Sequence, residues 1–384
     1  MNRPTKPLRQ AALVLEDGSE FPGWTFGRAR SQSGEVVFTT GMSGYPQSLT
    51  DPSFRGQILV STYPLVGNYG VPVDKSGEAF LDGSGIPCHF ESARIQVSGF
   101  VVAELCTEPS HFASGMALSG WLEKNNVPGI CGVDTRALTK RLREHGVMMG
   151  KILVEGKSDV TFDSGIVAHP VAEVSPAEAK IYLPQGVSAE EGEKLPRVAM
   201  IDCGAKANIL RCLLARRVKV FRLPWNHDFA DSDLAVDGIF LSNGPGDPKD
   251  CGKTIASLRR AFSLGKPVFG ICLGNQIMAL AAGGDTYKLP YGHRGQNQPC
   301  VELNGHKTGR CYITSQNHGY AVRRESLPSH WEPWFINGND GTIEGIRSTK
   351  GPFSAVQFHP EGCPGPRDTE FLIDRFVEQV QREQ

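Results

Sequence analysis

Residues 267–283 read PVFGICLGNQIMALAAG, an apolar run of strand length that ends at Cys272 and continues directly into a helix-forming stretch. The five residues 270–274, Gly-Ile-Cys-Leu-Gly, have the G-x-nucleophile-x-G spelling of a sharp strand-to-helix turn, with cysteine at the centre. Such a turn strains the central residue, and side chains two positions to either side would collide, so small flanking residues are needed. The stretch predicts a cysteine nucleophile. The alternative is a buried structural cysteine between two coincidental glycines, in a chain that holds 44 of them.

The sequence around this turn alternates between short apolar runs and amphipathic stretches from Val198 onward. This alternation is typical of a parallel sheet with crossover helices. The expected strands are VAMIDCG, VKVFRLP, GIFLSNG and PVFGIC, and the expected helices are ANILRCLLARR, TIASLRRAFSLG and NQIMALAAGG. From about residue 300 to 359 the pattern favours β-hairpins, and a last helix carries Phe371, Leu372, Phe376 and Val380 on its buried side.

The first 150 residues consist of short β-rich pieces separated by Gly and Pro, followed by one helix that we expect to start at Asp134 and stop at Gly146. Residues from about 155 to 196 lose periodicity and gather Asp, Glu, Pro and Ser. We therefore predict an N-terminal domain over 1–155, a linker over 156–196 and a second domain over 197–384. The predicted fold class is α/β: an open, mostly parallel sheet with flanking helices, preceded by a smaller β-rich α/β domain.

Composition argues against nucleic-acid binding, a membrane span, secretion and a structural zinc site. The 40 basic and 41 acidic residues leave no positive surplus for nucleic acid, and no apolar run of about 18 residues could span a membrane. The opening MNRPTKPLRQ lacks the apolar core of a secretory signal, so we expect a cytoplasmic protein. The ten cysteines form no CxxC pair and no Cys/His spacing of a structural zinc site, which indicates a reduced compartment and no metal.

His359 is the candidate base for Cys272. It lies in SAVQFHPEG, at the end of an expected strand, and Glu361 follows two residues later. Histidine can take the thiol proton and later protonate a leaving group, while the carboxylate orients the ring and supports its positive charge. The alternative is an ordinary strand-end histidine in a turn.

Two backbone N–H groups are candidates for an oxyanion hole. Cys272 at a helix N-terminus lies in the positive end of the helix dipole, which favours thiolate, and the N–H of Leu273 would face the developing oxyanion. NGPGDP, residues 243–248, follows another expected strand at its carboxyl end, where parallel sheets place ligand sites. Gly246 in that loop is the candidate second donor.

Three motifs, in this order, resemble those of the triad class of glutamine amidotransferases: NGPGDP, PVFGICLGNQ and FHPEG. Six further stretches extend the resemblance over nearly the whole chain, to the small subunits of carbamoyl phosphate synthetase: LVLEDGS, GEVVFTTGMSGYPQSLTDPSF, TYPLVGNYG, GVDTRALTKRLRE, GHRGQNQP and TSQNHGYAV. The spelling is most similar to the eukaryotic form, which is often fused to the synthetase. The resemblance is equally compatible with a free subunit or a fused domain, and with pyrimidine or arginine synthesis.

The resemblance implies that Cys272 is the nucleophile, His359 the base and Glu361 its partner. It also implies a set of contacts to L-glutamine, with the first domain contributing one of them at a domain interface: Ser53, Gly244, Gly246, Leu273, Gln276, Asn317, Gly319 and Tyr320. Ammonia would pass to a synthetase large subunit or fused synthetase domain, which would bind ATP and magnesium. No cofactor is expected in this chain, and no G-x-x-x-x-G-K-[ST] phosphate loop occurs in it.

Asn275 departs from the family, which usually has histidine at this position (CLGHQ). One interpretation is altered coupling to the partner, and the other is tolerated variation at a helix surface. Three other functions are compatible with parts of the pattern: the glutaminase of a different synthetase, a cysteine hydrolase of γ-glutamyl bonds, and a non-catalytic regulatory subunit. The N-terminal domain argues against the first two, and the retained sulfur and imidazole argue against the third.

Overall fold

The computed structural model describes residues 9–162, 168–230, 234–304 and 307–382. Two segments named above lie outside this range: the first eight residues, which belong to the opening that lacks the apolar core of a secretory signal, and residues 163–167 of the expected linker. The chain divides into two compact units: unit 1 comprises Met1–Phe80 and Cys88–Ala168, and unit 2 comprises Leu81–Pro87 and His169–Gln384. Each unit is described by itself.

Unit 1 is built on a closed sheet with the strand order β1-β2-β8-β6-β4-β3-β9. Its strands are β1 (Gln10–Leu15), β2 (Glu20–Gly27), β3 (Gln32–Thr39), β4 (Ile58–Ser61), β6 (Gly99–Val101), β8 (Pro128–Cys131) and β9 (Met148–Val154). A small pair, β5 (Leu65–Val66) and β7 (Glu104–Leu105), lies outside that sheet. The other elements are α1 (Tyr45–Thr50), η1 (Pro52–Phe54), α2 (Leu118–Lys124) and α3 (Thr135–His145).

Helix α3 shows why local sequence was sufficient for parts of unit 1. The Asp134 carboxylate accepts a hydrogen bond from the Ala137 N–H at 2.9 Å, and the helix ends before Gly146, whose φ is +90°. A side-chain cap at the start and a glycine with positive φ at the end are strong local signals. The prediction of this helix is confirmed.

Unit 2 is built on one sheet with the strand order β10-β12-β11-β13-β14-β19-β18-β16-β15-β17. β11 (Arg197–Asp202), β12 (Lys219–Pro224), β13 (Gly238–Leu241), β14 (Val268–Ile271) and β19 (Phe353–Val356) run parallel. β15 (Thr286–Asn304), β16 (Lys307–Val322), β17 (Trp331–Asn337) and β18 (Ile343–Ser348) extend the sheet in antiparallel fashion. The predicted open, mostly parallel α/β sheet followed by hairpin-like strands is confirmed.

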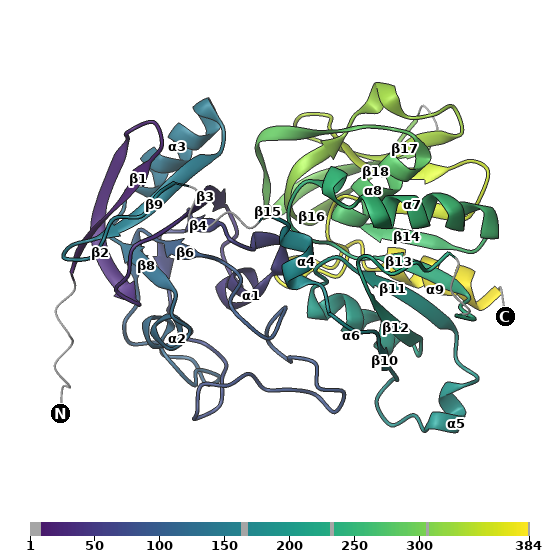
Figure 1. Ribbon diagram of the computed structural model, residues 1–384, viewed down its shortest axis with the longest axis horizontal. Helices are drawn as coiled ribbons and strands as arrows, with labels where there is room; N and C mark the ends of the chain where they lie inside the picture. Colours follow the sequence, from purple (N-terminus) through teal and green to yellow (C-terminus); the bar gives the residue numbers. More distant parts are fainter. Residues whose placement is uncertain (1–8, 163–167, 231–233, 305–306, 383–384) are drawn as a thin grey trace. The chain divides into compact units, whose positions relative to one another are not determined.

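Helices cover both faces of the parallel strands (Figure 1). α6 (Ala207–Ala215) and α9 (Phe371–Arg382) share one hydrophobic core, and α7 (Gly252–Ala261) and α8 (Leu273–Ala282) share the other. Alternate residues of β11 point to opposite cores, with Val198 and Met200 in the first and Ala199 and Ile201 in the second. A strand buried on both faces needs a continuous apolar run, which is the pattern that the sequence offers here.

Part of the expected linker is structured and belongs to unit 2. α4 (Pro170–Val174), β10 (Lys180–Tyr182) and α5 (Ala189–Gly192) lie within 156–196, and β10 pairs antiparallel with β12 at the edge of the sheet. Three 3-10 turns complete the described part of unit 2: η2 (Pro248–Asp250), η3 (Phe262–Leu264) and η4 (Arg324–Ser326). Within the described residues, no helix combines the length and the apolar character that crossing a bilayer requires.

Candidate active site

Cys272 occupies the turn between β14 and α8 and is buried, with φ +55° and ψ −104°. A positive φ in a non-glycine residue is strained, and such strain is typical of functional turns. The flanking glycines have a direct steric reason. A Cβ on Gly270 would lie 2.8 Å from the backbone of Gly274, and one on Gly274 would lie 2.5 Å from the carbonyl oxygen of Leu241.

His359 and Glu361 follow β19, the strand next to β14 in the sheet. The Nδ1 of His359 lies 2.7 Å from Oε1 of Glu361, and both side chains are buried. The His359 N–H also donates to the Ser315 carbonyl of β16 at 2.9 Å, which holds the backbone of this segment in place. A carboxylate can only accept, so when neutral the imidazole carries its proton on Nδ1, leaving Nε2 as a proton acceptor.

Cys272 and His359 interact. The nearby Cys272 thiol contributes to the raised pKa of His359, while Sγ itself donates to the Asn317 carbonyl oxygen at 3.6 Å. No hydrogen bond of ordinary geometry reaches Nε2 of His359 within the described residues. The sulfur and the imidazole, which are distant in sequence, are thus brought to the ends of two neighbouring strands.

Lys206 is a member of this cluster that the sequence analysis missed. Its side chain is buried, and its Nζ lies 3.0 Å from Oε1 of Glu361 and donates to the carbonyl of Gly362. A signal was present in the sequence, because Lys206 is the N-cap of α6, where a positive charge opposes the helix dipole. A lysine in that position indicates a tertiary partner with negative charge.

The charges of the cluster shift the pKa values of its members. Burial raises the pKa of Glu361, but the charges of Lys206 and His359 outweigh it and lower the pKa to about 2. Burial lowers the pKa of His359, but the charge of Glu361, the nearby Cys272 thiol and the hydrogen bond that His359 donates to Glu361 raise it to about 10, against an opposing effect of Lys206. The carboxylate is therefore ionised and the imidazole retains a proton strongly.

The NGPGDP loop follows β13 at its carboxyl end and is held close to the first turn after β11. A Cβ on Gly244 would lie 2.1 Å from the carbonyl oxygen of Cys203, so only glycine fits there. Gly246 has φ +88°, and the Asn243 side chain accepts from the Lys206 N–H at 3.0 Å. These contacts hold the loop beside the start of α8, where a Cβ on Gly244 would also meet the side chain of Leu273, and the role of Gly246 as an oxyanion donor stays a prediction.

Gln276 of α8 and the backbone of β16 are linked near Cys272. Gln276 donates from Nε2 to the Tyr320 carbonyl at 3.0 Å and to Oε1 of Gln357 at 3.2 Å. Asn317 is joined to the nucleophile through its carbonyl, as described above. Of the expected glutamine contacts, Asn317 is thus joined to Cys272, and Gln276 to Tyr320, while the role of each in binding glutamine stays a prediction.

Asn275 is not at a helix surface. It is fully buried on α8, and its Nδ2 donates to Oε1 of Gln357 at 3.2 Å, the same oxygen that Gln276 binds. The interpretation of Asn275 as surface variation is therefore wrong. The sequence could not reveal this, because α8 is covered by the sheet on one side and by α7 on the other.

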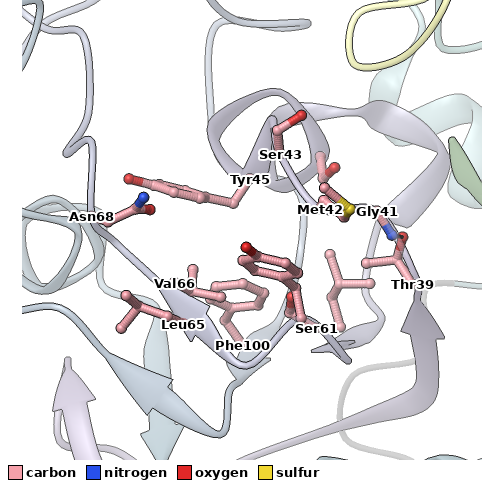
Figure 2. A pocket seen from close by; sticks show the side chains of 13 residues that line it. Thr39, Gly41, Met42, Ser43, Tyr45, Ser61, Leu65, Val66, Asn68 and Phe100 are labelled. Atoms are coloured by element: carbon pink, nitrogen blue, oxygen red, sulfur yellow. Dashed lines mark hydrogen bonds between the residues drawn. The ribbon is translucent and has the colours of Figure 1, made fainter. Parts of the chain in front are cut away.

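Unit 1 contains Ser53, the expected glutamine contact of the first domain, on η1. The Ser53 N–H donates to the Asp51 carboxylate at 2.9 Å. A separate hollow of unit 1, shown in Figure 2, is lined by Tyr45, Asn68, Met42 and other side chains, and Ser53 does not line it. The role of Ser53 stays a prediction.

Fold and site together define an α/β protein with a buried cysteine on a strained strand-to-helix turn. Residues 199–379 match the family model described as glutamine amidotransferase class-I, and residues 13–152 match that of the carbamoyl-phosphate synthase small chain, CPSase domain. The chain is 44% identical to the carbamoyl phosphate synthase arginine-specific small chain of Saccharomyces cerevisiae, with 98% of this chain and 90% of that protein covered. It therefore belongs to the carbamoyl-phosphate synthase small chain family and carries a class-I glutamine amidotransferase domain.

Longer proteins contain a similar sequence. The chain is 45% identical to the multifunctional protein pyr1-3 of Dictyostelium discoideum and 47% identical to the multifunctional protein pyr-3 of Neurospora crassa. The alignments cover 98% and 96% of this chain but only 17% and 21% of those proteins.

Proposed function

We propose that the chain is the glutaminase component of a carbamoyl phosphate synthetase. It would hydrolyse L-glutamine to glutamate and deliver ammonia to a synthetase large subunit or fused synthetase domain. The observation that carries the proposal is that Cys272, on its strained turn, and the buried pair of His359 and Glu361 follow the neighbouring strands β14 and β19. Membership in the small chain family supports the choice of glutamine as the substrate.

In the first half-reaction the thiolate of Cys272 attacks the side-chain amide carbon of glutamine, after its proton has passed to His359. The raised pKa of His359 favours this transfer. The amide oxygen becomes negative and is stabilised by the N–H groups of Leu273 and Gly246. His359 then protonates the leaving nitrogen, the C–N bond breaks, and ammonia and a γ-glutamyl thioester on Cys272 result.

In the second half-reaction His359 takes a proton from water, which attacks the thioester carbon. The C–S bond breaks, glutamate leaves, and Cys272 regains its thiolate form. Glu361 keeps the imidazole oriented and offsets its charge in both steps, and Lys206 positions Glu361. Neither Glu361 nor Lys206 exchanges a proton in this scheme.

Glutamine recognition would combine unit 2 with one side chain of unit 1. We propose that it is bound by Ser53 together with Gly244, Gly246, Leu273, Gln276, Asn317, Gly319 and Tyr320, since hydroxyl, amide and bare backbone groups suit a zwitterionic amino acid. Ser53→Ala is expected to raise KM for glutamine with little change in kcat. The exposed Ser76 is the matched control, and an equal effect of Ser76→Ala would remove Ser53 from the site.

ATP, magnesium and bicarbonate would bind to the synthetase, with no cofactor in this chain. Ammonia would reach that partner through a shielded path, because in bulk water it would be protonated and lose its nucleophilic lone pair. We further propose a cytoplasmic location and domains over 1–155 and 197–384 joined by residues 156–196, of which residues 169–196 belong to unit 2.

The test is an assay of glutamate release from L-glutamine, with and without a synthetase large subunit. Cys272→Ser should abolish glutamine use, while the complex still makes carbamoyl phosphate from added ammonium. If the Cys272→Ser variant continues to hydrolyse glutamine at the original rate, Cys272 is not the nucleophile. If ammonium-driven synthesis also stops, the loss reflects assembly rather than glutaminase chemistry.

A further inference from the structure

A second polar cluster of unit 2 plays no part in the proposed reaction. His293 of β15, His318 of β16 and Glu344 of β18 are buried, and one ligand atom of each lies within 4.8 Å of those of the other two. His293 and His318 are direct partners in the antiparallel pairing of β15 and β16, and their rings lie 4.9 Å apart between centroids. Buried ionisable groups are costly unless they are paired or bind a metal.

The backbone is shaped to bring His293 into this cluster. A register shift between Lys288 and His293 interrupts the pairing with β16, and Gly292 within it has φ +69°. A Cβ on Gly292 would lie 2.5 Å from the carbonyl oxygen of His318, so the bulge requires glycine. Bulges of this kind re-aim side chains and are frequent beside functional sites.

The hydrogen bonds of the two imidazoles decide which nitrogens face the centre. Nδ1 of His318 lies 2.8 Å from the Tyr320 carbonyl oxygen, which can only accept, so Nδ1 carries the proton and Nε2 presents a lone pair. Nε2 of His293 lies 2.9 Å from the Asp340 carboxylate, which leaves Nδ1 of His293 facing Glu344 at 3.2 Å. Each histidine thus has the outer hydrogen-bond acceptor that metal-binding histidines usually have.

The atoms that meet at the centre are mostly acceptors. Nε2 of His318 faces Oε1 of Gln316 at 3.2 Å and Oε1 of Glu344 at 3.8 Å. The Gln316 orientation is supported by its Nε2, which donates to Thr314 and Cys300. Asn337 donates to Oε1 of Glu344 at 3.1 Å, while Oε2 has no partner within the described residues although its side chain is fully buried. Facing lone pairs and an orphaned carboxylate oxygen indicate a missing cation.

We propose that His293, His318 and Glu344 bind one Zn²⁺ ion, with the amide oxygen of Gln316 available as the fourth ligand. Tetrahedral zinc with Zn–N bonds of about 2.0–2.1 Å separates its ligand atoms by about 3.3 Å. Three of the six distances among the four ligand atoms are 3.2, 3.2 and 3.8 Å, and the histidine and glutamate atoms lie within 4.8 Å of one another, so the side chains would draw closer around the ion. Two imidazoles and a carboxylate are a ligand set that zinc favours.

The ion would tie β15, β16 and β18 together next to Asn317, whose carbonyl contacts the Cys272 thiol.

The experiment measures zinc by mass spectrometry in the full chain, after incubation with ZnCl₂ and dialysis against buffer containing a weak chelator. One zinc per chain is expected. Glu344→Gln should lose it, and Asp340→Asn, a milder change at a half-exposed side chain, should weaken binding about 10–100-fold. His89→Gln, which changes an exposed histidine of unit 1, should retain one zinc. Less than about a tenth of an equivalent in the unmodified chain overturns the proposal, whatever the variants do.

Cobalt distinguishes this site from the ten free cysteines of the chain. Co²⁺ bound by nitrogen and oxygen gives the visible bands of a tetrahedral ion without the intense near-ultraviolet charge transfer of thiolate ligation. Visible bands that disappear in Glu344→Gln support the site. A thiolate band in the unmodified chain, unchanged in Asp340→Asn, would show that the metal binds to cysteine and would refute the assignment.

Discussion

The buried pair of Lys206 and Glu361 allows a quantitative prediction. Their charged atoms are 3.0 Å apart and the two side chains are 2% and 0% exposed. At an effective dielectric constant of about 20, two unit charges at this distance attract by about 5 kcal/mol. In Lys206→Met the attraction is lost and Glu361 stays buried with only His359 to offset its charge. We expect the variant to lose roughly 3 kcal/mol of stability.

The matched control is Lys249→Met. Lys249 lies 2.8 Å from Asp285, a shorter distance than that of the buried pair, but the side chains are 52% and 42% exposed. Solvent screens such a pair, so the same substitution should change stability little. Hydrogen exchange of the α8 amides reports opening of unit 2 alone, which avoids mixing the unfolding of two units.

The double variant Lys206→Met, Glu361→Gln separates stability from catalysis. It leaves no unpaired charge, so most of the lost stability should return. Glutamine hydrolysis should remain low, because a neutral side chain no longer supports the charged imidazole. If Lys206→Met costs no more than Lys249→Met, or if the second substitution restores nothing, the account of a coupled buried pair is wrong.

Three further predictions concern the turn, the family departure and pH. Gly274→Ala should cost roughly 1–3 kcal/mol because its Cβ would meet a backbone oxygen, whereas Gly252→Ala at the start of α7 meets open space and should be neutral or stabilising in the same urea titration. Asn275→His should change the synthetase-stimulated glutaminase rate, since Asn275 shares an acceptor with Gln276. If the basal rate and the stimulated rate of the variant both equal those of the unmodified chain, the departure from the family is neutral. Because the pKa of Glu361 is lowered, its ionised form stabilises the fold above pH 4.5, and this stabilisation is lost as the pH falls toward 2. Because the pKa of His359 is raised, its protonated form stabilises the fold below pH 6.5, and this stabilisation is lost as the pH rises toward 10. The urea midpoint of unit 2 should therefore be highest between about pH 4.5 and pH 6.5. In Glu361→Gln, the midpoint should fall less as the pH is lowered from 4.5 toward 2.

Short-range sequence was sufficient wherever the physical cause was local. The turn at Cys272 could be identified because the conflict that requires Gly270 arises within the turn itself, where a Cβ would meet the backbone of Gly274, whereas Gly274 is also required by the carbonyl oxygen of Leu241 on β13. The cap of α3 and the two-faced strands of the parallel sheet were predictable for the same reason, since capping and burial periodicity repeat over a few residues.

The tertiary structure decided what depends on segments that are far apart in the chain. Lys206 meets Glu361 across 155 residues, and Asn275 is buried because a sheet and a second helix close over α8. His293, His318 and Glu344 converge only because a bulge re-aims one strand and two others pair beside it, so no spacing in the sequence marks them. Local rules set which residues can form a turn or a cap, whereas the partner of a buried charge is set by the packing of the whole sheet, where leaving it unpaired costs several kcal/mol.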